Sequence, residues 1–291
     1  MKIGLYTPLS ADLASAALAI EIARVAEQCA FASLWVPEHA VLFDEYAANY
    51  PYSEDGMMPG GSEAQVLDPM PVLSFFAAHT ERIRIGTGVM ILPQRNPVYT
   101  AKELASLDVL SGGRLDVGIG VGWLAEEMRA LGTPYERRGA RTNDYVEVMK
   151  ALWCEDPSAF EGEFYSLPSC RFAPKPVQRP HPPLIFGGES RPALRRIARL
   201  GQGWNAAMKT PEEMARLLAE LDGLLAEEGR TRAELEITVM PGRPLDADDL
   251  KAYRDVGVDQ IVAFAAVPDA ASVRGMFEPI AEVLVTAAAS M

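Results

Sequence analysis

Two predicted strands in the first half of the chain end in glycine-rich sequence, and this limits the folds that the chain can adopt. They lie within 82–93 and 111–123, and the segment 96–110 between them has the pattern of a helix. Together they form one strand–helix–strand unit whose strand ends carry few side chains. Glycine at a strand end indicates unusual dihedral angles or a flat group held against the backbone. A large planar cofactor would need such a surface. The glycines are Gly86, Gly88, Gly118, Gly120 and Gly122.

Strand-like and helix-like segments alternate along all 291 residues. Each predicted strand is followed by a segment with helical periodicity, and no linker divides the chain. This alternation favours a parallel (β/α)8 TIM barrel in a single domain over 1–291, with a doubly wound sheet as the alternative. A long insertion, 37–67, follows the second strand, and an irregular, proline-rich segment, 155–182, precedes the fifth. The predicted strands are 2–7, 33–36, 83–92, 115–119, 183–186, 203–206, 235–240 and 260–264.

The charge and cysteine content argue against several classes of protein. With 27 Lys and Arg against 40 Asp and Glu, the net charge of −13 leaves no basic footprint for nucleic acid or for an anionic membrane surface. No apolar run approaches the roughly 20 residues of a membrane span. The three cysteines form no C-x-x-C pair, and no metal-ligand cluster is visible. We therefore expect a cytoplasmic protein without disulfides or a metal centre.

His39 is the sharpest single candidate for catalysis. In a barrel the chemistry lies at the carboxyl ends of the strands, and His39 follows the second predicted strand, directly after Glu38. An imidazole there can donate a hydrogen bond to a cofactor or move a proton near neutral pH. The alternative is an ordinary surface histidine at the start of a loop.

Two glycine motifs follow later strands. The sequence Gly120–Ala125 matches the G-x-G-x-x-A dinucleotide pattern, but that pattern belongs after the first strand of a mononucleotide-binding fold, and here it follows the fourth. We interpret it as backbone lying beside a ring system. The second motif, Gly187–Ser190, precedes a helix whose free N–H groups could bind phosphate. An ordinary strand-to-helix turn is the alternative.

A series of short motifs runs in order along the chain: Val36–His39, Gly86–Val89, Asn96–Pro97, Ala101–Lys102, Leu107–Asp108, Ser111–Arg114, Gly118–Trp123, Arg137–Gly139, Pro174–Pro176 and Pro182–Gly188. In these motifs the chain resembles the bacterial-luciferase-like family, and most closely its branch of probable coenzyme F420-dependent oxidoreductases. The resemblance covers the chain to about Trp204 and is weaker after it. It implies a TIM barrel, usually a homodimer, with a flavin or deazaflavin at the carboxyl face.

The resemblance also implies roles for individual residues. His39 matches the family's active-site histidine near the ring, and we expect Glu38 to orient it. Thr87, Gly88 and Val89 match a bulge in the third strand that supports the ring, where the family often has a non-prolyl cis peptide. Gly88–Val89 would be that bond.

Other positions concern the remaining parts of the cofactor. We expect Gly120, Gly122 and Trp123 to leave room beside the ring, and Gly187, Gly188, Glu189 and Ser190 to hold its phosphate. Two positions depart from the family. Val121 stands where luciferase itself has a phosphate-binding arginine. Trp123 stands where some F420-dependent relatives have a catalytic glutamate. The absence of this glutamate argues against a sugar-phosphate dehydrogenase mechanism.

These observations lead to an expected function. The chain is predicted to be an oxidoreductase that transfers hydride with coenzyme F420 on an unidentified small organic substrate, under a lid formed by 37–67. One alternative is an FMN-dependent monooxygenase that uses reduced flavin and O2, with a flavin or F420 reductase as its partner. Another is a non-catalytic flavin-binding barrel, and a third is a barrel that acts without a cofactor on a phosphorylated sugar.

Overall fold

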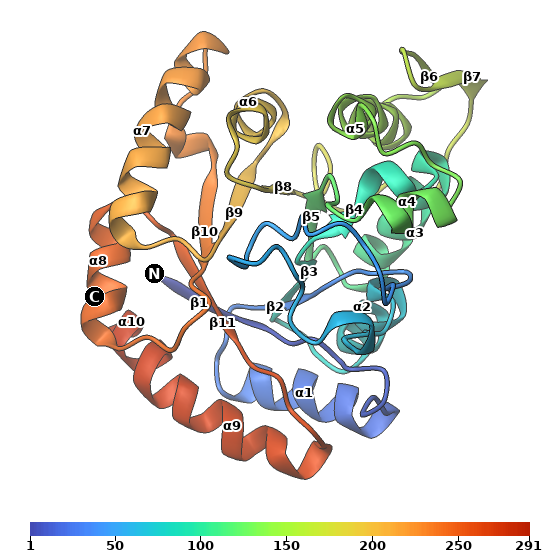
Figure 1. Cartoon of the computed structure of the whole chain (residues 1–291). Helices are drawn as coiled ribbons and strands as arrows, with labels where there is room; N and C mark the ends of the chain where they lie inside the picture. The colour runs from blue at the N-terminus through green and yellow to red at the C-terminus, as the bar shows by residue number, and fades with distance from the viewer.

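The computed structural model describes residues 1–291, and its centre is a closed barrel of parallel strands (Figure 1). Neighbouring strands pair in parallel around the ring, β11 beside β1, and the contact between β3 and β5 closes it. The predicted (β/α)8 TIM barrel is thereby confirmed. The barrel strands are β1 (Lys2–Tyr6), β2 (Ser33–Val36), β3 (Arg84–Thr87), β5 (Leu115–Gly120), β8 (Leu184–Gly187), β9 (Gly203–Ala207), β10 (Glu236–Met240) and β11 (Gln260–Phe264). A two-residue strand, β4 (Met90–Ile91), continues the run of β3 and pairs with β5.

Helices surround the barrel, and local sequence fixes where several of them begin. The Asn96 side chain accepts hydrogen bonds at the start of α3, whose first residue is a proline. The first helix begins at Ala16, four residues later than the sequence predicts, because the Ser15 side chain caps it by accepting from the Leu18 N–H. The main helices are α1 (Ala16–Gln28), α2 (Pro69–Ala78), α3 (Pro97–Leu110), α5 (Arg138–Cys154), α6 (Arg191–Leu200), α7 (Pro211–Glu227), α8 (Ala247–Asp255) and α9 (Val273–Ile280), the last continued by a π-helical turn (Ala281–Val285) and α10 (Thr286–Ala289).

Two segments and one short helix complete the chain. The insertion 37–67 contains no α-helix and only one 3-10 turn (Gly61–Glu63), as expected for a long loop. The segment 155–182 is less irregular than predicted, because it contains an antiparallel hairpin of β6 (Ser158–Glu161) and β7 (Ser166–Cys170). The prolines of this segment interrupt the alternating pattern by which a strand is recognised in the sequence. Pro168 can still lie in β7, because each strand of a lone hairpin has a free edge. The short helix α4 (Ala125–Ala130) is not evident in the sequence.

The barrel interior is filled by a few large side chains above a polar layer. Trp35, Ile185 and Val262 pack together there, against Tyr6. The Trp35 indole donates to Ser33 Oγ at 2.8 Å, and Ser33 Oγ in turn donates to Gln260 at 2.9 Å. A filled interior leaves the ends of the strands as the places where a ligand can bind.

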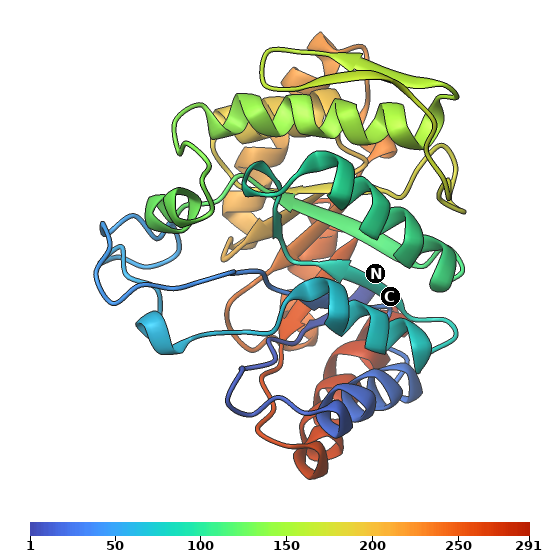
Figure 2. The same ribbon diagram turned by 90° about the vertical axis from the view of Figure 1, so that its right-hand side faces the viewer.

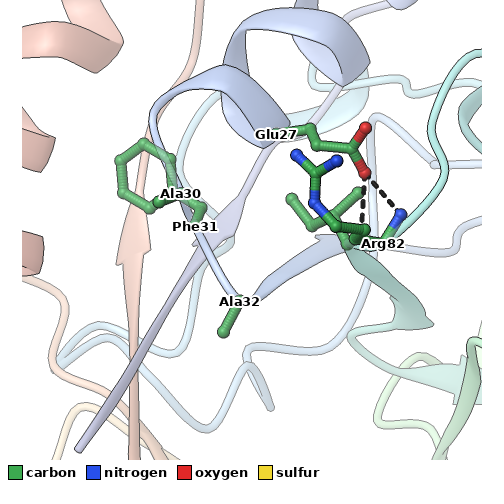
Figure 3. A pocket seen from close by; sticks show the side chains of 6 residues that line it. Glu27, Ala30, Phe31, Ala32 and Arg82 are labelled. Atoms are coloured by element: carbon green, nitrogen blue, oxygen red, sulfur yellow. Dashed lines mark hydrogen bonds between the residues drawn. The ribbon is translucent and has the colours of Figure 1, made fainter.

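Glu27, near the end of α1, lies at the amino end of the barrel strands. Its Oε1 accepts from the backbone N–H groups of Glu81, Arg82 and Ile83 at 3.0, 2.6 and 2.9 Å, which fixes the turn before β3. Figure 3 shows Glu27 beside Arg82. A cavity of about 250 Å³ borders this contact. It lies at the opposite end of the strands from the residues that the sequence analysis selects.

Glu27→Ala is expected to lower the free energy of unfolding by about 1–2 kcal/mol near neutral pH, because three N–H groups lose a charged acceptor. Partial burial acts to raise the pKa of Glu27, but the N–H donors outweigh it and hold that pKa below its ordinary value. A depressed pKa contributes stability above the unfolded-state value of about 4.3 and loses it as the pH falls through the folded-state value. Urea titrations of both proteins across this range measure the difference. Glu21→Ala, on the same helix, is the control, and a difference independent of pH would contradict the assignment.

Candidate active site at the carboxyl end of the barrel

The run of β3 is interrupted at its carboxyl end by a bulge. The peptide bond between Gly88 and Val89 is cis, as the family resemblance implied. Just before it, the Thr87 hydroxyl donates to the carbonyl of Gly118 at 2.7 Å. A Cβ atom at Gly118 would lie 1.7 Å from the Thr87 carbonyl oxygen, so only glycine permits this approach of the two strands.

Val89 occupies the space that two other glycines leave. A Cβ atom at Gly120 would lie 2.5 Å from Val89 Cγ2, and one at Gly187 would lie 3.2 Å from Val89 Cγ1. The expectation that Gly120 opens room for the ring therefore needs correction. The missing side chains at Gly120 and Gly187 accommodate Val89 and therefore the bulge itself.

Trp123 follows β5 and is the centre of an aromatic cluster. Gly122 before it has φ +75°, and a Cβ atom there would meet Met128 and Ile91. The Trp123 ring lies edge-on to His39, Tyr46 and Tyr50, with centroid distances of 5.8, 5.4 and 5.2 Å. The loop 37–67 thus reaches across to the end of β5, and Figure 2 shows it on the same side of the barrel as α4.

His39 is held by a carboxylate that the sequence analysis did not select. Its Nδ1 lies 2.9 Å from Oε2 of Glu127, a buried side chain on α4, and Oε1 of Glu127 accepts from the Ala40 N–H at 2.6 Å. Because a carboxylate only accepts, the contact places a hydrogen on Nδ1. Nε2 has no partner within the chain and remains free for a ligand.

Glu38 does not orient His39, contrary to expectation. Its carboxylate turns the other way and accepts from the Ile91 N–H at 2.5 Å and from Arg95 Nε at 2.6 Å. Burial raises the pKa of Glu38, while Arg95 and the Ile91 N–H act to lower it. Glu38 therefore anchors β4 and helps to hold the bulge in place.

Phenol and carboxyl groups gather beside the aromatic cluster. Burial raises the pKa of Tyr6, which stacks on Phe264 at 6.0 Å between ring centroids. Burial also raises the pKa of Tyr52, with smaller contributions from Glu189 and Tyr50. The phenol groups of Tyr6 and Tyr52 are therefore uncharged near neutral pH.

The loop between β8 and α6 has the geometry of an anion site in its backbone. Gly188 has φ +103°, and Ser190 is the N-cap of α6 with its hydroxyl unused. Pro192 has no N–H, but the N–H groups of Arg191 and Ala193 at the start of α6 are free to bind phosphate. The Glu189 carboxylate cannot hold phosphate, because both groups only accept hydrogen bonds. It accepts from the Ala207 N–H at 2.8 Å and so fastens the loop to β9. The backbone around Ser190, rather than the Glu189 carboxylate, would hold an anion here.

Two buried polar atoms at this end of the barrel have no partner in the chain. They are Thr7 Oγ1, just after β1, and Asn205 Oδ1, in β9. Buried hydroxyl and amide groups are rarely left unpaired, so both are available to a polar ligand. Together with the bulge and the free Nε2 of His39, they fit a planar, polar cofactor. No cluster of His, Cys, Asp and Glu suited to a metal ion is present, and no helix is long and apolar enough to cross a membrane.

A family model, similar sequences and similar solved structures all match this chain. The model of the luciferase-like monooxygenase family matches residues 1–282. An uncharacterised protein of Mycobacterium tuberculosis is 31% identical over 249 residues, which cover 86% of this chain and 85% of that protein. An FMNH(2)-dependent dimethylsulfone monooxygenase of Pseudomonas putida is 35% identical over 126 residues, covering 42% of this chain and 34% of that protein. The coenzyme F420-dependent tetrahydromethanopterin reductase of Methanopyrus kandleri superposes with a TM-score of 0.75 at 16% identity, over 98% of this chain and 99% of that one.

Proposed function

This chain belongs to the luciferase-like monooxygenase family, and on that premise we propose that it transfers hydride between coenzyme F420 and a small organic substrate. The proposal rests chiefly on the His39–Glu127 pair, which leaves Nε2 of His39 free beside the Trp123 cluster. The similarity in fold to an F420-dependent reductase supports it. The sequence resemblance to the F420-dependent branch favours F420 over FMN.

Each part of the site has a distinct role in this proposal. The bound deazaflavin supplies the ring carbon that accepts or donates hydride. The bulge Thr87–Val89 supports one face of the ring, and the backbone around Ser190 binds phosphate. His39 donates or accepts a hydrogen bond at Nε2 close to the reacting atoms, and Glu127 keeps the hydrogen on Nδ1.

The loop 37–67 excludes water in this proposal. Tyr46 and Tyr50 lie against Trp123, and Tyr50 lies 5.6 Å from Tyr52 between ring centroids. A wall formed mainly of aromatic rings favours a substrate with an apolar surface. Removing water also strengthens the hydrogen bond that His39 offers.

We propose in addition that the protein is a homodimer, as the family resemblance implies. The helix α3 leaves Tyr99 and Leu110 each 74% exposed, which is a large apolar area for a free surface. No nucleic acid or membrane is expected among its partners, because the net charge is −13.

An FMN-dependent monooxygenase is the second candidate. The similarity to the FMNH(2)-dependent dimethylsulfone monooxygenase over 126 residues favours it. In that case O2 would be the co-substrate, and a separate reductase would have to supply reduced flavin.

Titrating the purified protein with F420 and with FMN separates the two candidates. We expect F420 to bind at least about tenfold more tightly, equivalent to about 1.4 kcal/mol, and reduced FMN to cause no enzyme-dependent O2 uptake above its spontaneous oxidation. Fluorescence quenching measures the affinities, and an oxygen electrode measures uptake. Tighter binding of FMN together with O2 uptake would replace the first candidate by the second. Tight binding of either cofactor without any turnover would support a non-catalytic barrel, and no binding of either would contradict both enzymes.

A further inference from the structure

A second cavity lies in the outer helical layer, away from the barrel mouth. It measures about 440 Å³ and is walled by α5, α6 and α7. Figure 1 shows α6 between the other two helices. Three arginines of α6 line it, namely Arg195, Arg196 and Arg199. None of the three forms an ion pair, although two carboxylates, Glu227 and Glu228, line the same cavity.

Arg196 is the buried member of this group. Its side chain is more than nine-tenths buried, and it donates only to neutral atoms, from Nε to Asn143 Oδ1 at 2.7 Å and from a terminal nitrogen to the Gly139 carbonyl at 3.0 Å. A guanidinium has five N–H donors on three nitrogens. Only two of these nitrogens have a partner in the chain, and the other terminal nitrogen has none. Burial, with a smaller contribution from Arg199, lowers the pKa of Arg196 to about 10, still well above neutral pH.

The surrounding residues preserve this arrangement. A Cβ atom at Gly139 would lie 2.7 Å from a terminal nitrogen of Arg196, so glycine leaves room for the guanidinium. Arg195 and Arg199 are exposed at the cavity edge and form no ion pair, whereas Arg191 on the same helix pairs with Glu220 at 3.0 Å. Burying a charge without an opposite charge is costly. An anion bound in the cavity would compensate it.

We propose that this cavity binds a small phosphate monoester, with its phosphate on Arg195, Arg196 and Arg199. A phosphate group has three terminal oxygens and can accept from more than one guanidinium group, whereas a carboxylate has only two oxygens. Glu227 and Glu228, at the end of α7, also line the cavity. They favour a ligand whose other end carries hydroxyl groups that donate to them. The site is separate from the barrel mouth and independent of which cofactor binds there.

Glycerol 3-phosphate is a suitable probe, because it has one phosphate and two hydroxyl groups. At about 100 times its dissociation constant, the full-length protein should gain about 4 °C in Tm. Calorimetric titration should give a saturable isotherm, with succinate binding more weakly. Arg195→Ala combined with Arg199→Ala should weaken binding at least about tenfold, since charge-assisted bonds to phosphate are strong ones. Both side chains are exposed, so this variant is expected to fold.

Arg24→Ala combined with Arg216→Ala is the matched control, because it removes two exposed arginines from other helices. It should bind the probe as the unaltered protein does. An equal loss in the control would show a general charge effect and overturn the proposal. The absence of saturable binding, or tighter binding of succinate than of the probe, would also overturn the proposal. It would be overturned as well if the Arg195→Ala and Arg199→Ala variant still bound the probe, because that binding would belong to the loop at Ser190.

Discussion

His39→Ala is expected to lower turnover by about 100- to 10,000-fold, the range for loss of a positioned acid or base. The side chain leaves Nε2 free beside Trp123, so its removal takes away a donor or acceptor at the proposed reaction centre. Cofactor affinity should change much less, because the bulge and the loop at Ser190 remain. The measurement is the rate at which reduced cofactor is consumed, together with cofactor affinity, for the cofactor that the titration identifies.

Glu127→Gln tests whether Glu127 acts through His39. A glutamine can offer its NH2 group or its oxygen to Nδ1, so the hydrogen on Nδ1 is no longer enforced. We expect turnover to fall by up to about 100-fold, as for a misplaced group in an active site. In the His39→Ala background the same substitution should have almost no further effect on turnover, because the group that it positions is gone.

Glu126→Gln is the matched control for this pair. Glu126 is the preceding residue on α4 and forms only a surface ion pair with Arg129 at 2.7 Å, so its loss should leave turnover nearly unchanged. Nitrogen NMR of the His39 ring shows which ring nitrogen carries the hydrogen. This would not change in Glu127→Gln if Glu127 had a purely structural role. Unchanged turnover and cofactor affinity in His39→Ala would remove His39 from the site. An additive effect of Glu127→Gln would remove its link to His39.

The sequence contained enough information for the barrel but not for the partner of His39. Alternating strand and helix patterns and glycine-rich strand ends predict the architecture, because they depend on local periodicity and on backbone freedom. Glu127 lies 88 residues beyond His39 on a helix of six residues. Only folding of the insertion 37–67 onto the end of β5 brings the two together.

The prediction that Glu38 orients His39 rested on their being consecutive in the chain, and it is wrong. Both residues lie in the loop that follows β2, which ends at Val36, and there Glu38 turns toward Ile91 and Arg95 while His39 turns toward Glu127. The same limit applies to the glycines. Their positions indicated a close approach of backbone, but not that the approaching group would be Thr87 and Val89 of the same chain.

Gly118→Ala is expected to have the largest effect on stability of any single methyl group added to the barrel. Its Cβ would lie 1.7 Å from the Thr87 carbonyl oxygen, which is backbone and cannot rotate away. Either β3 or β5 must shift, and we expect a loss of about 3 kcal/mol or more, at or above the upper end for overpacked sites. The shift would also displace the bulge, so cofactor affinity should fall together with stability.

Two other glycine substitutions test whether the loss of stability in Gly118→Ala comes from a contact with backbone. In Gly120→Ala the obstacle is the Val89 side chain at 2.5 Å, so adding Val89→Ala should recover much of the lost stability, whereas it should not rescue Gly118→Ala. Gly223→Ala lies within α7 with nothing near its Cβ, and should stabilise the protein by about 0.5–1 kcal/mol. Urea unfolding measures the stability of all five variants: the three single glycine substitutions and the two double variants that add Val89→Ala. If Gly118→Ala proved as stable as the unaltered protein, or were rescued by Val89→Ala, the two strands would not be locked through the Thr87 carbonyl. The proposed support of the ring by this bulge would then lose its structural basis.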